Sequence, residues 1–287
     1  MSLGGVSLGG LSLGGPAGTL GRPQTRLARS SPRCGRPVLR PPVFTAPAAD
    51  LAGQQIVLRG REGRHASTVR RLDAGERVDV TDGAGTVAQC TVIASAPGEL
   101  SLAVLTRRTE PPAQPRLVVL QAILKGDRGE LAVELLTEVG VDVIVPWSAE
   151  RCVAVWRGDR AARSRARWSM TAQEAAKQSR RAWFPEVTAQ ADLAAAVRRV
   201  DAAAQAIVLD PDATVGLASL EPPATGEIVL VIGPEGGISA AEADALQEAG
   251  AVPAALGPTV LRASTAGVAA ASVILSRTGR WQGRAAE

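Results

Sequence analysis

The pattern of apolar residues changes at a proline-rich segment, residues 110–115 (EPPAQP), and this change constrains the fold most strongly. Before it, apolar runs are short and are separated by Gly, Asp and Pro, which is typical of strands joined by turns. After it, longer apolar runs alternate with stretches of helical spacing. We therefore predict a small β-barrel over residues 42–110, a linker over residues 111–116 and an α/β domain over residues 117–287. The strands of the barrel are predicted at residues 56–58, 78–80, 87–92 and 100–105.

The α/β domain is predicted from a regular succession of strand and helix patterns, which indicates a mostly parallel sheet. Residues 117–124 form an uninterrupted apolar run, as expected of a strand that is buried on both faces. Residues 130–139 then carry apolar side chains at helical spacing, and Gly140 ends the pattern. Ser239 and Glu242 have the spacing of a capping box at the start of a later helix. Further strands are predicted at residues 141–145, 206–209, 228–232 and near Leu256, and further helices at residues 161–182, 239–248 and 265–276.

The first 41 residues differ in composition from the rest of the chain. They repeat the motif SLGG three times, and residues 1–49 contain six arginines and no acidic residue. The remaining 26 basic residues are balanced by 28 acidic ones, so the alkaline pI comes from this segment. A glycine-rich stretch without core-forming periodicity is expected to be disordered. It is either a dispensable extension, including a mis-assigned start, or an organelle transit peptide, because transit peptides are rich in Arg and Ser and poor in acids.

The composition disfavours several classes of protein. The longest uncharged apolar stretch near the C-terminus, residues 265–275, is about half of a bilayer span, so no transmembrane helix is predicted. Cys34, Cys90 and Cys152 are scattered and odd in number, which indicates a reducing compartment rather than a disulfide framework or a metal site. We therefore expect a cytoplasmic protein, or an organellar one if the N-terminal segment is a transit peptide. His65 is the only histidine, so any histidine-based site must use it.

Two glycine-containing loops are the candidate ligand site of the α/β domain. Residues 233–237 (GPEGG) follow the strand predicted at residues 228–232, and residues 256–266 follow the next strand. Loops at the carboxyl ends of parallel strands are where α/β sheets bind ligands, and glycine lets the backbone approach the ligand. The first loop lacks the Lys and Ser/Thr of a phosphate loop, and Glu235 suits a neutral or cationic ligand better. We expect the loops to line one pocket; the alternative for the first is a tight turn without a ligand.

A third glycine motif, residues 82–88 (DGAGTVA), fits the G-x-G-x-x-A pattern of dinucleotide-binding loops. Such a loop must be followed by a helix. The β-branched residues that follow predict a strand instead, so we interpret this motif as the turn of a hairpin.

Basic residues gather in two parts of the otherwise near-neutral body. Residues 151–181 carry nine basic and two acidic side chains, and residues 59–77 carry six arginines and three acids. Local excesses of positive charge are typical of surfaces that bind the phosphate backbone of a nucleic acid. The alternative is that both are solvated faces without a partner. Trp168 and Trp183 are interpreted either as core residues or as platforms for base stacking.

Taken in order, these segments resemble those of the RsmE family, the 16S ribosomal RNA (uracil-N3)-methyltransferases of the knotted SPOUT superfamily. The two loops match its GPEGG…E and LG…LRxxTA motifs. Three more segments are similar to family motifs: residues 65–75 (H-x-x-x-V-x-R…G), 125–141 (K-x-x-x-x-E…E-x-G) and 167–185 (R-W…E-A-x-x-Q-S-x-R…P). The resemblance covers residues 42–280. Ser264 stands where the family usually has Glu, and Ile238 stands where it has Phe.

The resemblance implies a C-terminal α/β domain with a deep trefoil knot, a PUA-like N-terminal barrel that binds RNA, and a homodimer formed through the knotted domain. It also implies methylation of N3 of a specific uridine in 16S rRNA, free or in the small ribosomal subunit, with S-adenosylmethionine as the cofactor. Neither a metal nor a membrane is expected to take part. Two alternatives stay open: a knotted methyltransferase that acts on another RNA or atom, and a non-catalytic RNA-binding protein, for which Ser264 is the only indication.

The resemblance assigns residues to three roles. Arg262 is the candidate catalytic residue, because a guanidinium group stabilises negative charge on the uracil oxygens; a phosphate contact or a structural ion pair is the alternative. His65 is either an RNA contact or a surface residue without chemistry. The expected cofactor-binding residues are Leu209, Ile232, Gly233, Glu235, Gly236, Leu256, Gly257, Leu261, Arg262, Thr265 and Ala266. The expected RNA-binding residues are His65, Arg70, Arg71, Lys125, Arg163, Arg165, Arg167 and Arg181.

Overall fold

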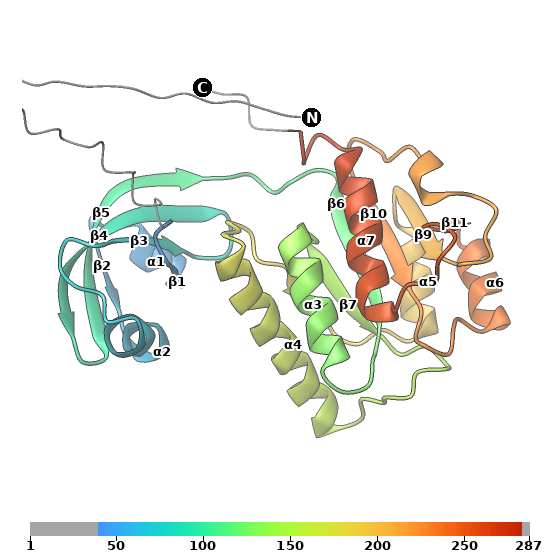
Figure 1. Ribbon diagram of the computed structural model, residues 1–287, viewed down its shortest axis with the longest axis horizontal. Coiled ribbons are helices and arrows are strands. Elements are labelled where there is room, and N and C mark those ends of the chain that lie inside the picture. Colours follow the sequence, from blue (N-terminus) through green and yellow to red (C-terminus); the bar gives the residue numbers. More distant parts are fainter. Residues whose placement is uncertain (1–39, 283–287) are drawn as a thin grey trace, which may run out of the picture. The chain divides into compact units, whose positions relative to one another are not determined.

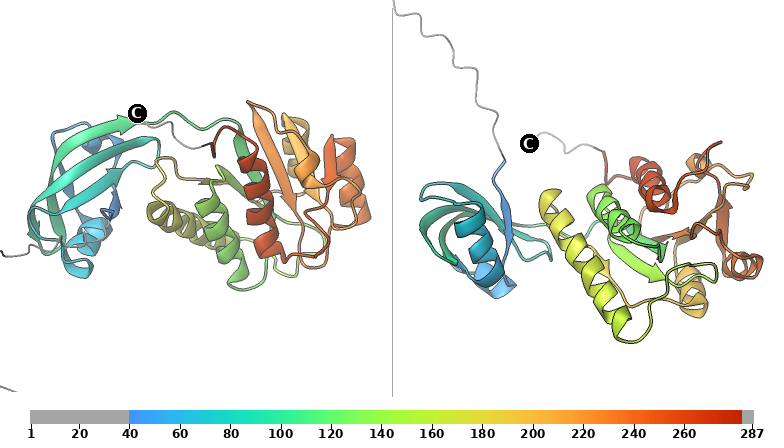
Figure 2. Two further views of the ribbon diagram at one scale, coloured as in Figure 1. Left: turned by 45° about the horizontal axis from the view of Figure 1, so that its top comes forward. Right: turned by 60° about the horizontal axis from the view of Figure 1, so that its bottom comes forward.

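The computed structural model describes residues 40–282, whose strands form two separate sheets (Figures 1 and 2). A five-stranded sheet belongs to the N-terminal domain, and a six-stranded sheet belongs to the α/β domain. The disorder predicted for residues 1–41 falls, except for its last two positions, outside the described residues. Every helix among residues 40–282 is too short or too polar to cross a membrane.

The N-terminal sheet has the strand order β1-β3-β4-β5-β2, in which only β1 and β3 pair in parallel. Its strands are β1 (Val43–Thr45), β2 (Gln55–Leu58), β3 (Arg77–Thr81), β4 (Thr86–Ala96) and β5 (Glu99–Thr109). Val78, Leu100 and Leu102 are fully buried in the core of this domain. The antiparallel pairing of β4 with β5 extends beyond the predicted strands into residues that are exposed, where the apolar pattern has already ended.

Two short helices of this domain have no counterpart among the predicted elements. They are α1 (Ala48–Leu51) and α2 (Gly60–Arg64), and α2 continues as one π-helical turn over His65–Val69. Each segment buries a single residue, so none of them shows a helical pattern of apolar residues.

The motif at residues 82–88 is the turn between β3 and β4. One carboxylate oxygen of Asp82 accepts the N–H groups of Ala84 at 2.8 Å and Thr86 at 3.0 Å. The strand β4 follows directly, which confirms the hairpin and excludes a dinucleotide-binding loop at this place.

All six strands of the second sheet are parallel, in the order β11-β9-β10-β6-β7-β8, which confirms the predicted parallel sheet. The strands are β6 (Arg116–Ala122), β7 (Val143–Trp147), β8 (Glu186–Val187), β9 (Gln205–Leu209), β10 (Glu227–Ile232) and β11 (Ala251–Ala254). The strand predicted near Leu256 is wrong by a few residues, because β11 ends where its partner β9 ends, at Leu209.

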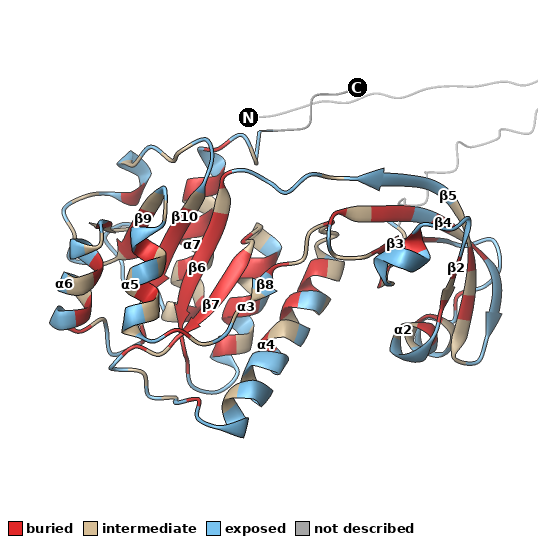
Figure 3. Cartoon of the chain, turned by 180° about the vertical axis from the view of Figure 1, so that it is seen from behind, coloured by how far each residue is buried: buried red, intermediate tan, exposed pale blue. Residues whose placement is uncertain are grey.

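Helices cover both faces of the parallel sheet (Figure 3). One face carries α3 (Arg128–Val139), α4 (Asp159–Gln178), α7 (Ala263–Ser276) and the 3-10 turn η2 (Leu217–Ser219), and the other carries α5 (Leu193–Asp201) and α6 (Ala240–Glu248). Successive residues of a strand point to opposite faces, so Val119 of β6 packs in the first layer and Leu120 in the second. The continuous apolar run of β6 follows from this burial on both sides.

Several predicted helix boundaries differ from those of the structure: α3, α4 and α7 each begin two residues earlier than predicted, and α4 ends four residues earlier. The helix predicted over residues 161–182 is α4, and it ends at Gln178. Arg180 adopts a left-handed backbone conformation (φ 58°), and the N–H of Arg181 returns to the carbonyl of Ala176 at 2.9 Å, so the chain leaves the helix there. The last helix, α7, begins at Ala263, two residues earlier than predicted, and Arg262 is its N-cap. The trefoil knot implied by the resemblance stays a prediction.

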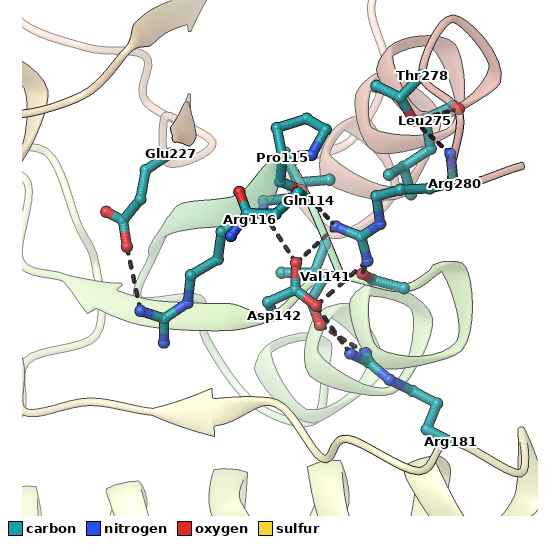
Figure 4. A network of polar contacts seen from close by, with 12 residues as sticks. Gln114, Pro115, Arg116, Val141, Asp142, Arg181, Glu227, Leu275, Thr278 and Arg280 are labelled. Carbon is teal, nitrogen blue, oxygen red and sulfur yellow. Dashed lines mark hydrogen bonds and ion pairs between the residues drawn. The ribbon is translucent and has the colours of Figure 1, made fainter. Parts of the chain in front are cut away.

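Asp142 connects four segments at the end of the sheet where the strands begin (Figure 4). Its carboxylate accepts the N–H of Leu117 at 2.9 Å and ion-pairs with Arg280 at 2.6 Å and Arg181 at 3.2 Å. Arg280 also donates to the carbonyl of Gly140 at 2.7 Å, at the end of α3. The three charged side chains are only 11–15% exposed, so each depends on the others for its counter-charge.

The structure corrects the prediction that Arg181 binds RNA. The guanidinium of Arg181 points into the protein, where it donates to the carbonyls of Val141 at 2.5 Å and Thr137 at 3.0 Å as well as to Asp142. Burial lowers the pKa of Arg181 to about 10, against the opposing effect of Asp142, so it stays charged at neutral pH. The sequence pattern predicts a helix through residue 182, and on such a helix Arg181 would belong to the same exposed basic face as Arg163 and Arg167.

We predict that Asp142→Asn lowers the free energy of unfolding by about 3–5 kcal/mol, because it leaves two nearly buried guanidinium groups without a full counter-charge. Urea unfolding followed by circular dichroism measures the change. The control is Glu130→Gln, which removes an ion pair with the exposed Arg167 and is expected to cost at most about 1 kcal/mol. Equal losses in the two variants would contradict the structural role of Asp142.

Candidate active site

A cavity of about 570 Å³ lies at the carboxyl ends of β9, β10 and β11. Its lining comes from the end of β9 and the loop after it, from the ends of β10 and β11 and the loops that follow them, from Ala243 of α6, and from the first turn of α7. Because these strands are parallel, the loops that leave them meet at one edge of the sheet. This is the edge opposite to Asp142.

Nine of the eleven predicted cofactor-binding residues line this one cavity. They are Leu209, Ile232, Gly233, Glu235, Leu256, Gly257, Leu261, Arg262 and Ala266. Gly236 and Thr265 are not part of the lining. A Cβ atom at Gly236 would lie 3.1 Å from the Cβ of Arg151, so this glycine faces the segment after β7. The hydroxyl of Thr265 donates to the carbonyl of Arg262 at 3.1 Å, within the first turn of α7.

The loop after β10 has a backbone that favours glycine at two of its positions. A Cβ atom at Gly233 would lie 2.7 Å from the side chain of Ile238, so a larger residue does not fit there. Gly237 has a positive φ (76°), and its N–H closes a turn to the carbonyl of Pro234 at 2.9 Å. The predicted capping box at Ser239 is confirmed and starts α6 at the end of this loop.

The segment after β7 holds the same loop from outside the cavity. The buried carboxylate of Glu242 accepts the N–H of Glu150 at 2.7 Å, and Arg151 donates to the carbonyl of Gly236 at 3.2 Å. Arg128, at the start of α3, pairs with Glu235 at 3.3 Å. Sequence reasoning missed these supports because the partners are more than eighty residues apart.

Charged groups are distributed unevenly around the cavity. Asp210, Asp212 and Glu235 line it, whereas Arg262 is the one basic residue in the lining that residues 40–282 provide. Asp210 and Asp212 were not predicted as part of the site. Their place directly after a buried strand is the sequence feature that could have identified them as cavity residues. An acidic lining favours a ligand that carries positive charge.

Arg262 has an exposed side chain that forms no ion pair within residues 40–282. Its backbone is fixed, because its carbonyl accepts the N–H groups of Thr265 and Ala266, each at 2.8 Å. The N-terminus of α7 adds a partial positive charge at the same place. The guanidinium and the helix end together favour a group that becomes negative beside the cavity.

Most of the predicted RNA-binding residues are exposed. Arg163, Arg165 and Arg167 lie on α4, Arg70 and Arg71 follow the π-helical turn, and Lys125 lies between β6 and α3. His65 is half-buried, with its ring edge-on to Phe44 at 6.0 Å. Trp168 is a core residue rather than a stacking platform, since it is 2% exposed and packs against Trp156 at 5.0 Å.

Two family models match the chain. One describes the RNA methyltransferase PUA domain and matches residues 58–105, and the other describes the RNA methyltransferase domain and matches residues 111–275. The ribosomal RNA small subunit methyltransferase E of Mycobacterium tuberculosis is 42% identical over 239 residues, which are 82% of this chain and 91% of that protein. The enzyme of the same name from Bacillus subtilis is 28% identical, over 77% of this chain and 90% of its own length.

Solved structures agree with these matches. The ribosomal RNA small subunit methyltransferase E of Neisseria gonorrhoeae, bound to S-adenosyl methionine, is 26% identical and covers 84% of this chain and 100% of its own, with a TM-score of 0.75. A Legionella pneumophila protein in complex with the bound cofactor SAM is also 26% identical, covers 84% and 99%, and has a TM-score of 0.76. The chain therefore belongs to the RNA methyltransferase family of ribosomal RNA small subunit methyltransferase E, with a PUA domain before its methyltransferase domain.

Proposed function

We propose that this chain methylates N3 of a specific uridine in the 16S rRNA of the small ribosomal subunit, with S-adenosylmethionine as the methyl donor. The observation that carries the proposal is the meeting of the two family-like glycine loops around one cavity, with Arg262 in its lining. The proposal also draws on the name of the relatives, whose match extends over most of the chain.

The lining of the cavity fits S-adenosylmethionine in size and character. Ile232, Leu256 and Leu261 offer apolar surface, and the backbone at Gly233 and Gly257 is accessible to a ligand. The carboxylates of Asp210 and Asp212 suit the positive charges of the sulfonium and amino groups, whereas the charge of Glu235 is already balanced by Arg128. When bound, S-adenosylmethionine supplies an activated methyl group.

The chain must provide orientation and a favourable electrostatic field. N3 of uracil is a weak acid, and it becomes nucleophilic only when its proton leaves and negative charge spreads to the neighbouring oxygens. Arg262 and the N-terminus of α7 stabilise that charge, and the backbone hydrogen bonds of the first turn hold the backbone of Arg262 beside the cavity. The uridine is expected to be turned out of its stack to reach the cavity.

RNA binding is assigned to the exposed cations. Arg163, Arg165 and Arg167 on α4 and Lys125 are free to reach phosphates, although Arg167 also pairs with Glu130 at 3.3 Å. Arg70, Arg71 and His65 belong to the PUA domain and extend this assignment to the N-terminal part. Association of two copies through the α/β domain and a cytoplasmic location are further parts of the proposal, supported by the family resemblance and by the cysteine pattern.

The alternative of a non-catalytic RNA-binding protein rested on Ser264. That residue is 5% exposed and lies in the first turn of α7, and it does not line the cavity. Ser264 itself therefore gives no sign of a damaged cavity, and nine of the eleven expected cofactor-binding residues line that cavity, so we favour the enzyme.

The experiment that tests the proposal uses the full chain, S-adenosylmethionine with a labelled methyl group, and small ribosomal subunits from a strain that lacks the gene. Mass spectrometry of the digested RNA should find one added methyl group, on N3 of one uridine. Naked 16S rRNA is the parallel substrate and shows whether the assembled subunit is required. A methyl group on another atom or RNA, or none at all, would contradict the proposal.

We predict that Arg262→Ala lowers the rate constant of methylation by about a hundredfold, because an electrostatic donor of this kind contributes about 3 kcal/mol. Arg262→Lys should recover only part of the rate, since the planar fork is lost. Single-turnover measurements at saturating cofactor and RNA separate this effect from binding. The control is Arg277→Ala, at the other end of α7, which should leave the rate unchanged. A rate for Arg262→Ala within about threefold of the wild type would make Arg262 a structural residue.

We predict that neutralising Arg163, Arg165 and Arg167 together weakens RNA binding and leaves cofactor binding intact. Each lost phosphate contact should reduce the slope of log affinity against log salt concentration by about 0.7–0.9. Titrations at several salt concentrations measure the slope. Arg198→Gln, on α5 at the other face of the sheet, is the control and should not change it. An unchanged slope in the triple variant would mean that this face of α4 is only solvated.

A further inference from the structure

Apart from the indole N–H of Trp147, Gln121 has the one fully buried polar side chain in the described strands of the parallel sheet. It is fully buried near the end of β6, where Leu117 and Val119 point to the same face and pack in the layer of α3 and α7. Its partner in register on β10 is Ile232, which lines the cavity. An apolar residue is what the burial pattern of β6 would favour at this position.

The amide of Gln121 lies between β6 and the first turn of α7. Its Nε2 donates to the carbonyl of Ala263 at 3.4 Å and to the carbonyl of Ala122 at 3.3 Å. Its Oε1 has no hydrogen-bond partner within the described part of the chain. A Cβ atom built on Gly267 would lie 3.4 Å from this oxygen, so the amide faces α7 directly.

The stability of the fold does not account for a glutamine here. A buried acceptor without a partner costs free energy, and the two hydrogen bonds that the amide donates are long. A leucine of similar volume would remove the unpaired oxygen and continue the apolar surface of Leu117 and Val119. Gln121 is therefore expected to lower the free energy of unfolding relative to an apolar residue at this position.

The contact with Ala263 reaches the candidate active site. Ala263 follows Arg262, and both residues line the cavity together with Ala266 of the same turn. We propose that Gln121 is a positioning residue for methylation, whose amide holds the first turn of α7 against β6 and so fixes the place of Arg262 beside the cavity. This inference rests on the proposed function.

The test compares Gln121→Leu with Thr137→Val, a control that also replaces a fully buried polar group by an apolar one of similar shape, at the far end of α3. Urea unfolding and single-turnover methylation at saturating cofactor and RNA are measured for both. We expect Gln121→Leu to unfold at the same or a higher urea concentration than the wild type, and to methylate at least about tenfold more slowly. Thr137→Val should keep the wild-type rate.

A double-mutant cycle with Arg262→Ala gives a readout that a merely structural residue would not change. If Gln121 acts by placing Arg262, removing the guanidinium should cost less than about tenfold in the Gln121→Leu background, compared with about a hundredfold in the wild type. Gln121→Met, which keeps the length of the side chain, repeats the measurement if the leucine variant does not fold. Loss of folding in both variants would overturn the inference.

The remaining outcomes separate this inference from the proposed function. No methylation by the wild type would contradict the proposed function itself. If the wild type methylates normally, two results would overturn the role of Gln121 and leave the proposed function intact. One is a rate for Gln121→Leu within about threefold of the wild type, and the other is rate losses that multiply in the double variant.

Discussion

The common direction of all six strands is the constraint on which the rest of this molecule depends. Parallel strands start at one edge of the sheet and end at the other, so the two edges become chemically different places. The loops after β9, β10 and β11 must meet at the carboxyl edge, where they enclose the cavity. Residues that are about fifty positions apart in the chain, such as Asp210 and Arg262, line the same cavity for this reason.

One edge of the sheet holds a buried ion cluster that stabilises the fold, and the other edge holds the candidate active site. At the edge where the strands begin, Asp142 neutralises Arg181 and Arg280 and ties the ends of α3, α4 and α7 to β6 and β7. At the other edge, Gly233 and Gly237 shape a loop that offers backbone and carboxylate groups to a ligand. The helix α7 runs between the edges, with the ion cluster beyond its C-terminus and Arg262 at its N-cap.

The arginines show how burial decides the role of a side chain. Arg181 belongs by sequence to the same basic stretch as Arg163 and Arg165, yet its guanidinium is buried and bonded to backbone carbonyls and Asp142. The others are exposed on α4. The difference arises where α4 ends, because the left-handed backbone of Arg180 turns the chain inward and buries the side chain of Arg181.

The alternation of strands and helices in the α/β domain, the parallel sheet, the hairpin at residues 82–88, the capping box and the two glycine-containing loops were predictable from local sequence. Short-range signals carry these features: apolar periodicity, glycine after a strand, and a capping residue before a helix. The individual residues of the cavity lining came from the family resemblance, and α5 and β8 were not predicted. The helices α1 and α2 were not predictable, because each is about one turn long and buries one residue. The contacts of Glu150 with Glu242, of Arg151 with Gly236 and of Gln121 with Ala263 join residues that are 85 to 142 positions apart. No local pattern encodes such pairs, since they exist only when the packing of the sheet and α7 brings distant backbone groups within hydrogen-bond distance.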